Sequence, residues 1–459
     1  MTGLWTQKTA ARATGGLAVG DWTATGVSID SRTVQPGDLF VALRGENNDA
    51  HAYVPQALAA GAVASVVDHT VDGPHLLVPD TMAALEDLGR FARARVNAPI
   101  AAITGSVGKT SSKEALTQLL AAQAPTYGSR GNLNNNFGVP LSLARMPESV
   151  RFGVFELGMN HAGEIAPLSR QVRPHVALVT AIAPAHIEFF ADGEAGIARE
   201  KASIAEGLEP GGTLLLPRDS VHFEVMAAAY SKILSFGTHV DADSRLLDWQ
   251  PGTDGVDTVE ATILGQRRRY RWGLAGKHQA MNSLGVLTAL VTLGGDLDAA
   301  CAVTESLRPV AGRGERLTLP WQGGTITLLD ESYNASPTAV RAALSVLATL
   351  PGRRVLVLGD MLELGSEADA LHASLADALE GAKLDRIYLS GTHVAALANA
   401  LPEGRVTHHA ARTADLIDAV KADLAPGDAL LVKGSLGMKM RPLVEALRAA
   451  SAASQKVSP

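Results

Sequence analysis

The residues with the clearest chemistry follow a short apolar run near residue 100. Ile100–Ile103 predicts a buried strand, and Thr104–Ser111 then spells Thr-Gly-Ser-Val-Gly-Lys-Thr-Ser. Strand, glycine-rich turn and helix start come in the order that a phosphate-binding loop requires, because backbone N–H groups and the positive helix end then face an anion. Lys109 can reach the outer phosphates of a nucleoside triphosphate, and the Thr110 hydroxyl can ligate Mg²⁺. The sequence therefore predicts a nucleotide site.

The loop departs from the general phosphate-loop pattern at one position. That pattern has a glycine six residues before its lysine, and Ile103 stands there in this chain. Gly105 and Gly108 instead enclose a shorter turn. A chance Gly-Lys-Thr in a surface turn is the alternative, and the flanking strand and helix patterns favour the phosphate loop.

Other polar side chains follow predicted strands, where sites form in α/β proteins. Glu156 closes an apolar run and could hold Mg²⁺, or it could be a solvated strand end. His186 follows the run Val176–Ala181, and a histidine in an apolar segment is more often structural. Lys201 lies in an ordinary helical pattern, and its neighbours alone favour a solvated lysine.

An asparagine-rich segment and a set of polar strand ends complete the candidates. Gly131–Pro140 holds four asparagines, which suit neither a strand nor a core. Amides both donate and accept, which suits a polyhydroxylated or amide-rich substrate, although a surface loop is the alternative. In the last third, polar residues follow three predicted strands, and helix caps such as Ser336-Pro337 explain part of this pattern. These strand ends are Asp330, Asp360 and Lys433-Gly434-Ser435.

Composition limits the classes of function. A chain of 459 residues is too long for one core, and about three domains are expected. A net charge of −7 and 4% aromatic residues argue against nucleic-acid binding. The single cysteine, Cys301, cannot form an internal disulfide and fits a reducing compartment. Neither a secretory leader nor an 18-residue apolar run is readable, so we expect a cytoplasmic protein without a membrane span.

The patterns that must position these residues divide the chain into units 1–98, 99–309 and 310–459. Strands are predicted in the first unit at Gly26–Ile29, Leu39–Leu43, Ala62–Val67 and Leu76–Val78. In the second they are predicted at Ile100–Ile103, Phe152–Leu157, Val176–Ala181 and Thr213–Leu216, and in the third at Ile326–Leu329, Arg354–Leu358, Arg386–Leu389 and Ala429–Val432. Residues 231–272 predict antiparallel strands, and 449–459 predict a frayed tail.

Together these segments resemble the Mur ligases of peptidoglycan synthesis, in one collinear order from about Thr25 to Pro442. The loop is similar to the family's own short phosphate loop, and Gly276–Asn282 is similar to its segment beside the adenine. The resemblance implies catalytic roles for Lys109, Glu156, His186 and Lys201, and metal ligation by Thr110, Glu156, His186 and a carbamylated Lys201. It implies nucleotide contacts at Gly105, Ser106, Gly108, Lys109, Thr110, Ser111, His278, Asn282, Arg313 and Asp330.

Further segments are similar to particular members of the family. Val27–Leu43 resembles the uridine-binding start of members that extend the peptide late, with Ala50 where the family has a glycine further on. Gly131–Pro140, Glu156–Glu164 and Gly359–Gly365 resemble members that add D-alanyl-D-alanine, as does Asp330–Pro337. The implied substrate contacts are Ser31, Arg32, Asn134, Asn135, Asn334, Ser336 and Asp360.

The resemblance also implies the fold and the reaction. We expect an α/β protein of three domains: a small α/β uridine-binding domain, a central P-loop mononucleotide-binding domain and a C-terminal Rossmann-like doubly wound domain. The implied enzyme is a monomer that uses ATP and Mg²⁺ to join D-alanyl-D-alanine to UDP-N-acetylmuramoyl-tripeptide through an acyl phosphate. The alternatives are a Mur-type ligase that adds diaminopimelate or lysine, a ligase that adds glutamate to folate, and a nucleotide-binding scaffold without turnover.

Overall fold

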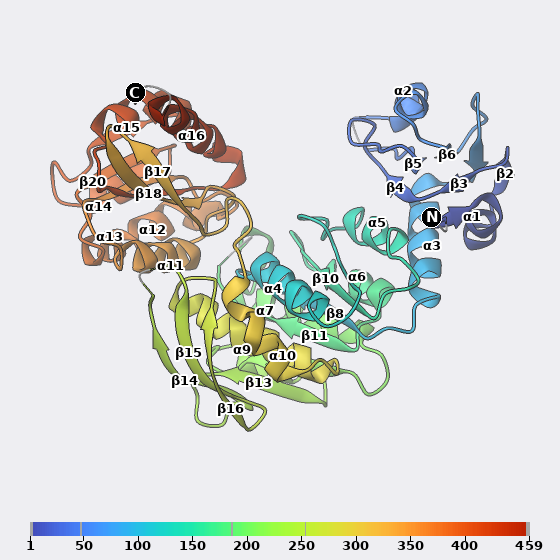
Figure 1. The fold of residues 1–459 in the computed structure, drawn as a ribbon, viewed down its shortest axis with the longest axis horizontal. Helices are drawn as coiled ribbons and strands as arrows, with labels where there is room; N and C mark the ends of the chain where they lie inside the picture. Colours follow the sequence, from blue (N-terminus) through green and yellow to red (C-terminus); the bar gives the residue numbers. More distant parts are fainter. Residues whose placement is uncertain (1–2, 46–47, 185–186, 253, 456–459) are drawn as a thin grey trace.

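The computed structural model describes residues 3–45, 48–184, 187–252 and 254–455. Three large sheets, of five, nine and six strands, organise these residues, together with a two-stranded ribbon of β1 (Trp5–Thr6) and β3 (Thr23–Ala24). Figure 1 shows the first unit (blue) and the third (orange to red) at opposite sides above the second (teal to yellow). Among the described residues, no helix combines the length and the apolar character needed to cross a bilayer.

The first sheet has the strand order β2-β7-β6-β5-β4, and β4 to β7 run parallel. Its strands are β2 (Leu17–Val19), β4 (Gly26–Ser28), β5 (Asp38–Val41), β6 (Ala64–Val67) and β7 (His75–Leu77), with helices α1 (Gln7–Thr14), α2 (Val54–Ala59) and α3 (Thr81–Ala94). The four predicted strands of this unit are confirmed. The Asp80 carboxylate starts α3 by accepting the N–H groups of Met82 and Ala83.

The central sheet has the order β16-β15-β14-β13-β12-β11-β8-β10-β9. Its parallel strands are β8 (Ile100–Thr104), β9 (Thr126–Gly128), β10 (Phe152–Glu156), β11 (Val176–Val179), β12 (Thr213–Pro217) and β13 (Ile233–Gly237). β10 and β9 lie on one side of β8, and β11 lies on the other side. The order of strands therefore reverses beside β8, and ligands bind α/β sheets at the carboxyl edge of such a point.

Three further strands extend this sheet: β14 (Ser244–Gln250), β15 (Asp257–Ile263) and β16 (Gln266–Trp272). β14 runs parallel to β13, and β15 pairs antiparallel with both β14 and β16, so the antiparallel pairing predicted for residues 231–272 is confirmed for β14 to β16 and is wrong for β13. Helices cover both faces of the sheet and form a separate apolar cluster with each face. One face carries α4 (Lys109–Ala121), α9 (Lys277–Thr292) and α10 (Leu297–Val303). The other carries α5 (Gly138–Ala144), α6 (Ile165–Val172), α7 (Gly193–Ala202) and α8 (Phe223–Ala227).

The third sheet has the order β17-β18-β22-β19-β20-β21, with only β17 antiparallel among the described strands. Its strands are β17 (Glu315–Trp321), β18 (Gly324–Glu331), β19 (Arg354–Gly359), β20 (Arg386–Ser390), β21 (His408–Ala410) and β22 (Ala429–Lys433). Helices α11 (Pro337–Leu347), α12 (Ala368–Ala373), α13 (Ala376–Gly381) and α14 (Val394–Ala400) cover one face, and α15 (Ile417–Asp423) and α16 (Arg441–Gln455) the other. This is the expected doubly wound arrangement.

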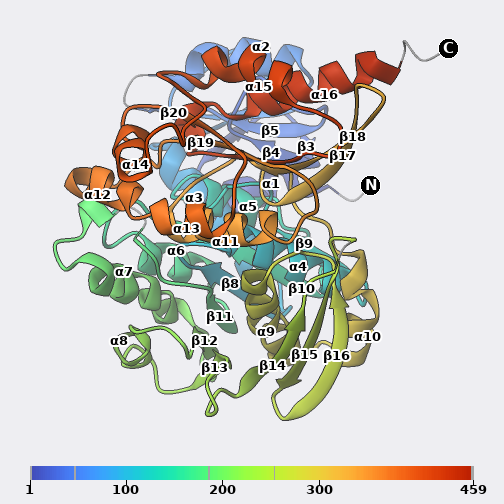
Figure 2. The same ribbon diagram turned by 90° about the vertical axis from the view of Figure 1, so that its left-hand side faces the viewer.

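The predicted frayed tail is wrong over most of its length. α16 continues to Gln455 and forms one helix along the outside of the third unit (Figure 2). Leu443, Val444 and Leu447 bury one face of this helix against the sheet, and the following alanines have the highest helix propensity of any residue. The helix therefore continues beyond the last buried leucine.

Candidate active site

The predicted phosphate loop lies between the end of β8 and the start of α4, at the point where the strand order reverses. Gly105 has a φ of +145°, and a Cβ there would lie 2.0 Å from Thr180 Oγ1. Gly108 has a φ of +87°, and a Cβ there would lie 2.7 Å from Asn282 Nδ2. Both positions therefore require glycine, and the shorter turn without a glycine at Ile103 is a complete loop.

Hydrogen bonds fix this loop against the chain that follows β11. Ser106 N–H donates to the Ala181 carbonyl at 2.7 Å, and Ser106 Oγ donates to the Ala183 carbonyl at 2.9 Å. Lys109 Nζ donates to the Gly105 and Ser106 carbonyls at 2.7 and 3.3 Å, which places its ammonium over the loop. Ser111 lies in the first turn of α4, whose N–H groups have no partner within the helix.

A buried carboxylate lies directly beside the loop. Glu156, the last residue of β10, is 1% exposed, and its Oε2 accepts the Thr110 hydroxyl at 2.8 Å. Its Oε1 accepts the Asn134 amide at 2.8 Å, and its backbone N–H donates to Ser129 Oγ at 3.2 Å. Sequence alone left open a solvated strand end at Glu156, and burial removes that alternative. Hydroxyl and carboxylate oxygens are the hard donors that Mg²⁺ prefers.

Two lysines interact electrostatically at this site, the half-buried Lys109 and the buried Lys201. Burial lowers the pKa of Lys201 at the end of α7 well below its usual range, and the charge of Lys109 lowers that pKa further. Burial also lowers the pKa of Lys109, while Glu156 opposes the shift and Arg313 adds to it. Loop, carboxylate, Lys201 and the third unit's Arg313 therefore share one electrostatic environment. His186 lies outside the described residues.

A cavity of about 570 Å³ opens between the second and third units, and His278 and Arg313 are among its lining residues. His278 Nδ1 is buried and has no hydrogen-bond partner among the described residues, and burial lowers the pKa of this imidazole. The Arg313 guanidinium stacks 3.9 Å from the centre of the Tyr333 ring. A neutral imidazole and a flat guanidinium are groups that can bind a planar, polar ligand such as a nucleotide base.

Asp257 holds the segment that carries His278, and sequence reasoning missed it. Its carboxylate accepts Trp249 Nε1–H at 2.8 Å and the Gly276 N–H at 2.7 Å. Gly276 has a φ of +108°, so this turn needs both glycine and an acceptor for its N–H group. Asp257 begins a strand in an ordinary alternating pattern, and nothing local in the sequence marks it.

The polar strand ends of the third sheet do gather at one edge. Asp330 is buried and accepts the Ser332 N–H at 3.1 Å. Lys433 Nζ, 1% exposed, donates to Glu331 Oε2 at 3.1 Å and to the Asn334 carbonyl at 3.0 Å. Ser336 caps α11 through the Ala339 N–H, as its position before proline predicted.

Several expected substrate contacts are engaged within the protein. Asp360 accepts the N–H groups of Thr392 and Val394, both at 2.8 Å, so its carboxylate positions the start of α14. Asn135 Oδ1 accepts the Gly138 N–H at the start of α5. Asn134 faces Glu156, as described above. In the first unit, Ser31 and Arg32 follow β4, and the exposed Arg32 pairs with Asp30 at 2.6 Å.

Three family models match successive parts of the chain. They are described as Mur ligase family, catalytic domain (residues 23–93), Mur ligase middle domain (103–290) and Mur ligase, glutamate ligase domain (312–436). The UDP-N-acetylmuramoyl-tripeptide–D-alanyl-D-alanine ligase of Escherichia coli K12 is 36% identical over 95% of this chain and 96% of its own length. The chain belongs to the Mur ligase family.

Other relatives of this Mur ligase agree in sequence and fold. The enzyme of that same name from Bacillus subtilis is 33% identical over 92% of the chain and 93% of its own length. The crystal structure of MurF from Acinetobacter baumannii superposes with a TM-score of 0.86, at 30% identity over 97% of the chain and 99% of that structure. The MurF ligase from Thermotoga maritima in complex with ADP has a TM-score of 0.80, at 26% identity over 94% of the chain and 98% of that structure.

Proposed function

We propose that this Mur ligase joins D-alanyl-D-alanine to UDP-N-acetylmuramoyl-tripeptide with ATP as the energy source. The observation that carries the proposal is the similarity to ligases of that name over nearly the whole chain. The group of Lys109, Thr110 and Glu156 at the loop supports it, because an anionic triphosphate needs a cation and metal-ligating oxygens at its phosphates. The ADP complex of the Thermotoga relative supports ATP as the nucleotide.

The reaction proceeds in two displacements. The terminal carboxylate of the tripeptide attacks the γ-phosphate of ATP, ADP leaves, and an acyl phosphate forms. The D-alanyl-D-alanine amine then attacks the acyl carbon, inorganic phosphate leaves, and the new amide loses its extra proton. Both nucleophiles come from substrates, so the protein contributes positioning and charge neutralisation. Lys109 offsets the repulsion between the carboxylate and the triphosphate, and Asn134 holds Glu156 in place.

The donors beside the loop fit a magnesium ion. The Thr110 hydroxyl and the Glu156 carboxylate lie 2.8 Å apart, and both are hard oxygen donors. Family resemblance adds His186 and a carbamylated Lys201 to the proposed ligands. Bound Mg²⁺ neutralises phosphate charge and orients the phosphate oxygens.

The surroundings of Lys201 support the carbamylation that the family resemblance implies. Burial lowers the pKa of Lys201 and so favours its neutral amine, which is the form that reacts with CO₂. An N–C bond forms, one proton leaves, and the product is an anionic oxygen ligand that no longer repels Lys109. Lys201→Ala should abolish most ligation, and small carboxylates should restore part of it. Full activity without added carboxylate would contradict this role.

The three units take different substrates in this proposal. Unit 1–98 binds the uridine end of the nucleotide peptide through Ser31 and Arg32. Unit 99–309 binds ATP at the phosphate loop, and unit 310–459 binds the dipeptide near Asn334 and Ser336, with Asp330 on the ribose. We also propose that the enzyme works as a monomer in the cytoplasm.

Release of inorganic phosphate with a panel of amines tests the proposal. Phosphate release from ATP should require both UDP-N-acetylmuramoyl-tripeptide and D-alanyl-D-alanine. Diaminopimelate and lysine serve as the control amines with UDP-N-acetylmuramoyl-dipeptide as acceptor. Release that depends on a single amino acid and not on D-alanyl-D-alanine would assign the chain to another Mur reaction.

A further inference from the structure

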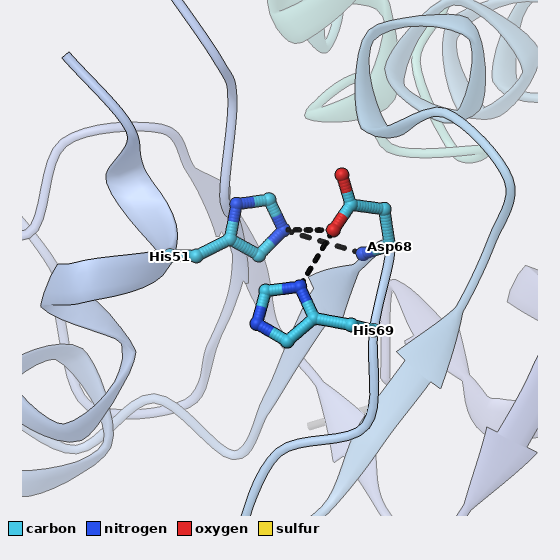
Figure 3. A group of neighbouring side chains, drawn as sticks. All are labelled: His51, Asp68 and His69. Carbon is cyan, nitrogen blue, oxygen red and sulfur yellow. Dashed lines mark hydrogen bonds and ion pairs between the residues drawn. The ribbon is translucent and has the colours of Figure 1, made fainter.

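The first unit holds a cluster of ligand-type side chains that the proposed reaction does not use. Within the described residues, His51, Asp68 and His69 form one group of three such side chains, with ligand atoms within 4.8 Å of one another. His51 comes from the 3₁₀ helix Ala50–Tyr53 after β5, and Asp68 and His69 directly follow β6 (Figure 3). Because β5 and β6 are parallel neighbours, the cluster lies at the carboxyl edge of the first sheet.

The three ligand atoms are close enough to converge on one ion after small side-chain rotations. Asp68 Oδ1 lies 3.2 Å from His51 Nε2 and 2.7 Å from His69 Nδ1, and the two imidazole rings are 4.8 Å apart at their centres. The His51 side chain is 5% exposed, Asp68 is 17% exposed and His69 is 55% exposed. The cluster is therefore closed on the protein side and open on the side of His69, where a water molecule can complete a coordination shell.

The hydrogen bonds of His51 determine which ring nitrogen is a donor. Asp49 Oδ1 lies 2.5 Å from His51 Nδ1 and accepts its proton, while Nε2 accepts the Asp68 backbone N–H at 3.2 Å. Nε2 therefore carries a lone pair, and the Asp68 carboxylate oxygen 3.2 Å away carries another. Two acceptors at this distance repel each other; the Arg44 guanidinium, which donates to Asp68 Oδ1 at 3.2 Å, offsets part of this repulsion, and a cation between the two acceptors would offset the rest.

An outer layer of charged groups supports the cluster in the way typical of metal sites. Arg44 Nη2 donates to Asp68 Oδ1 at 3.2 Å and lies 3.1 Å from Asp68 Oδ2, and Arg44 Nε lies 3.3 Å from Asp49 Oδ2. Metal-bound histidines usually donate their second N–H to a carboxylate, and metal-bound carboxylates are themselves hydrogen-bonded. Asp49 and Arg44 supply both features.

We infer that His51 Nε2, Asp68 Oδ1 and His69 Nδ1 form a binding site for a divalent transition-metal ion such as Zn²⁺. Two imidazoles and one carboxylate suit Zn²⁺, Co²⁺ or Ni²⁺, whereas Mg²⁺ takes oxygen ligands. His69 ligates in the tautomer that carries its proton on Nε2. The ion ties the segment after β5 to the end of β6, so it stabilises the first unit. None of the three ligands takes part in the proposed ligase chemistry at the phosphate loop.

Calorimetric titration of the full-length, EDTA-treated chain with ZnCl₂ tests the site, with excess Mg²⁺ and ADP present to occupy the phosphate loop. The wild type should bind one Zn²⁺ that His69→Ala weakens at least about tenfold, and Asp49→Asn should weaken binding about tenfold through the orientation of His51. The matched control is His239→Ala, because His239 is a similarly exposed histidine of the second unit. Co²⁺ should give visible absorption in the wild type that His69→Ala removes.

Two results would overturn the inference. The first is a wild-type titration without Zn²⁺ binding, which would mean that a proton alone joins His51 to Asp68. The second is equal Zn²⁺ affinity in His69→Ala and His239→Ala, which would place the ion elsewhere. Circular dichroism of each variant checks that it is folded, and His69 is exposed enough for truncation to leave the fold intact.

Discussion

Burial and then the charge of the half-buried Lys109 lower the pKa of Lys201, and Lys109 in turn interacts with the buried carboxylate of Glu156. Burying a charge is costly, so the site favours whatever reduces the number of positive charges in it. A neutral or carbamylated Lys201 does so, and the phosphates of the nucleotide balance Lys109. The sequence around Lys201 predicts a helix but not the burial of this side chain. The burial that lowers its pKa comes from segments distant in the sequence, so the local pattern does not mark Lys201 as functional.

A pH-dependent stability should follow from Lys201. Its pKa in the folded chain is well below the ordinary value of 10.5. At pH values between the folded-state pKa and 10.5, the unfolded chain therefore binds up to one more proton than the folded chain does. The free energy of unfolding therefore rises with pH in this window, by up to about 1.4 kcal/mol per pH unit. Urea denaturation in CO₂-free buffer from about pH 8 to about pH 10 should show the wild type gaining stability relative to Lys201→Met. A pH-independent difference would contradict the depressed pKa.

At the scale of elements, Lys113 joins α4 to Ser129, just before the asparagine-rich segment Gly131–Pro140. This lysine is fully buried, and its Nζ donates to the Ser129 carbonyl at 2.7 Å and to Glu114. Ser129 Oγ in turn accepts the Glu156 N–H. The start of the phosphate-loop helix thereby fixes the turn that leads to Asn134. Lys113 shares a helix face with Leu116 and Leu120, which was the available sign of its burial.

Lys113→Met should destabilise the protein by about 1–3 kcal/mol, because it leaves the buried Ser129 carbonyl without a donor. It should also raise the KM for Mg²⁺ more than the KM for either substrate, since the Glu156 region loses its support. Denaturation and steady-state kinetics measure both effects. Glu114→Gln is the matched control, because it removes the partly exposed partner and keeps the bond to Ser129. Equal effects of both substitutions would reject the coupling.

The elements predicted from sequence were those with continuous apolar runs or strong caps. β8, β10, β11 and β12 are buried parallel strands and were found. β17 was missed, because its burial alternates weakly and its pairing depends on the turn at Gln322 and Gly323, where both φ angles are positive. The roles of Asn134 and Asp360 were also beyond the sequence, because their partners lie in other elements.

At the scale of the whole molecule, hydrogen bonds between residues far apart in the sequence fix the first unit to the second, and no sequence pattern specifies them. Trp5 Nε1 donates to the Ala144 carbonyl at 2.9 Å, and Arg145 Nε donates to the Val27 carbonyl at 2.6 Å. The connection to the third unit is different. It contains Gly312 and Gly314, with φ angles of +76° and +92°, which suit a hinge.

Binding of nucleotide and UDP-N-acetylmuramoyl-tripeptide together should close the third unit towards the other two, because the reacting groups come from different units. Small-angle X-ray scattering should show a smaller radius of gyration with both ligands than with neither. ADP alone is the control for partial closure. An unchanged radius of gyration at saturation would contradict hinge closure about Gly312 and Gly314.

This Mur ligase should form one amide bond, between the tripeptide carboxylate and the amine of D-alanyl-D-alanine. Mass spectrometry of a reaction with ATP, Mg²⁺, UDP-N-acetylmuramoyl-tripeptide and D-alanyl-D-alanine tests it most directly. We predict one product whose mass is the sum of the tripeptide nucleotide and the dipeptide less one water, formed together with ADP and phosphate. ATP hydrolysis without this product, or a product only from UDP-N-acetylmuramoyl-dipeptide and a single amino acid, would contradict the account.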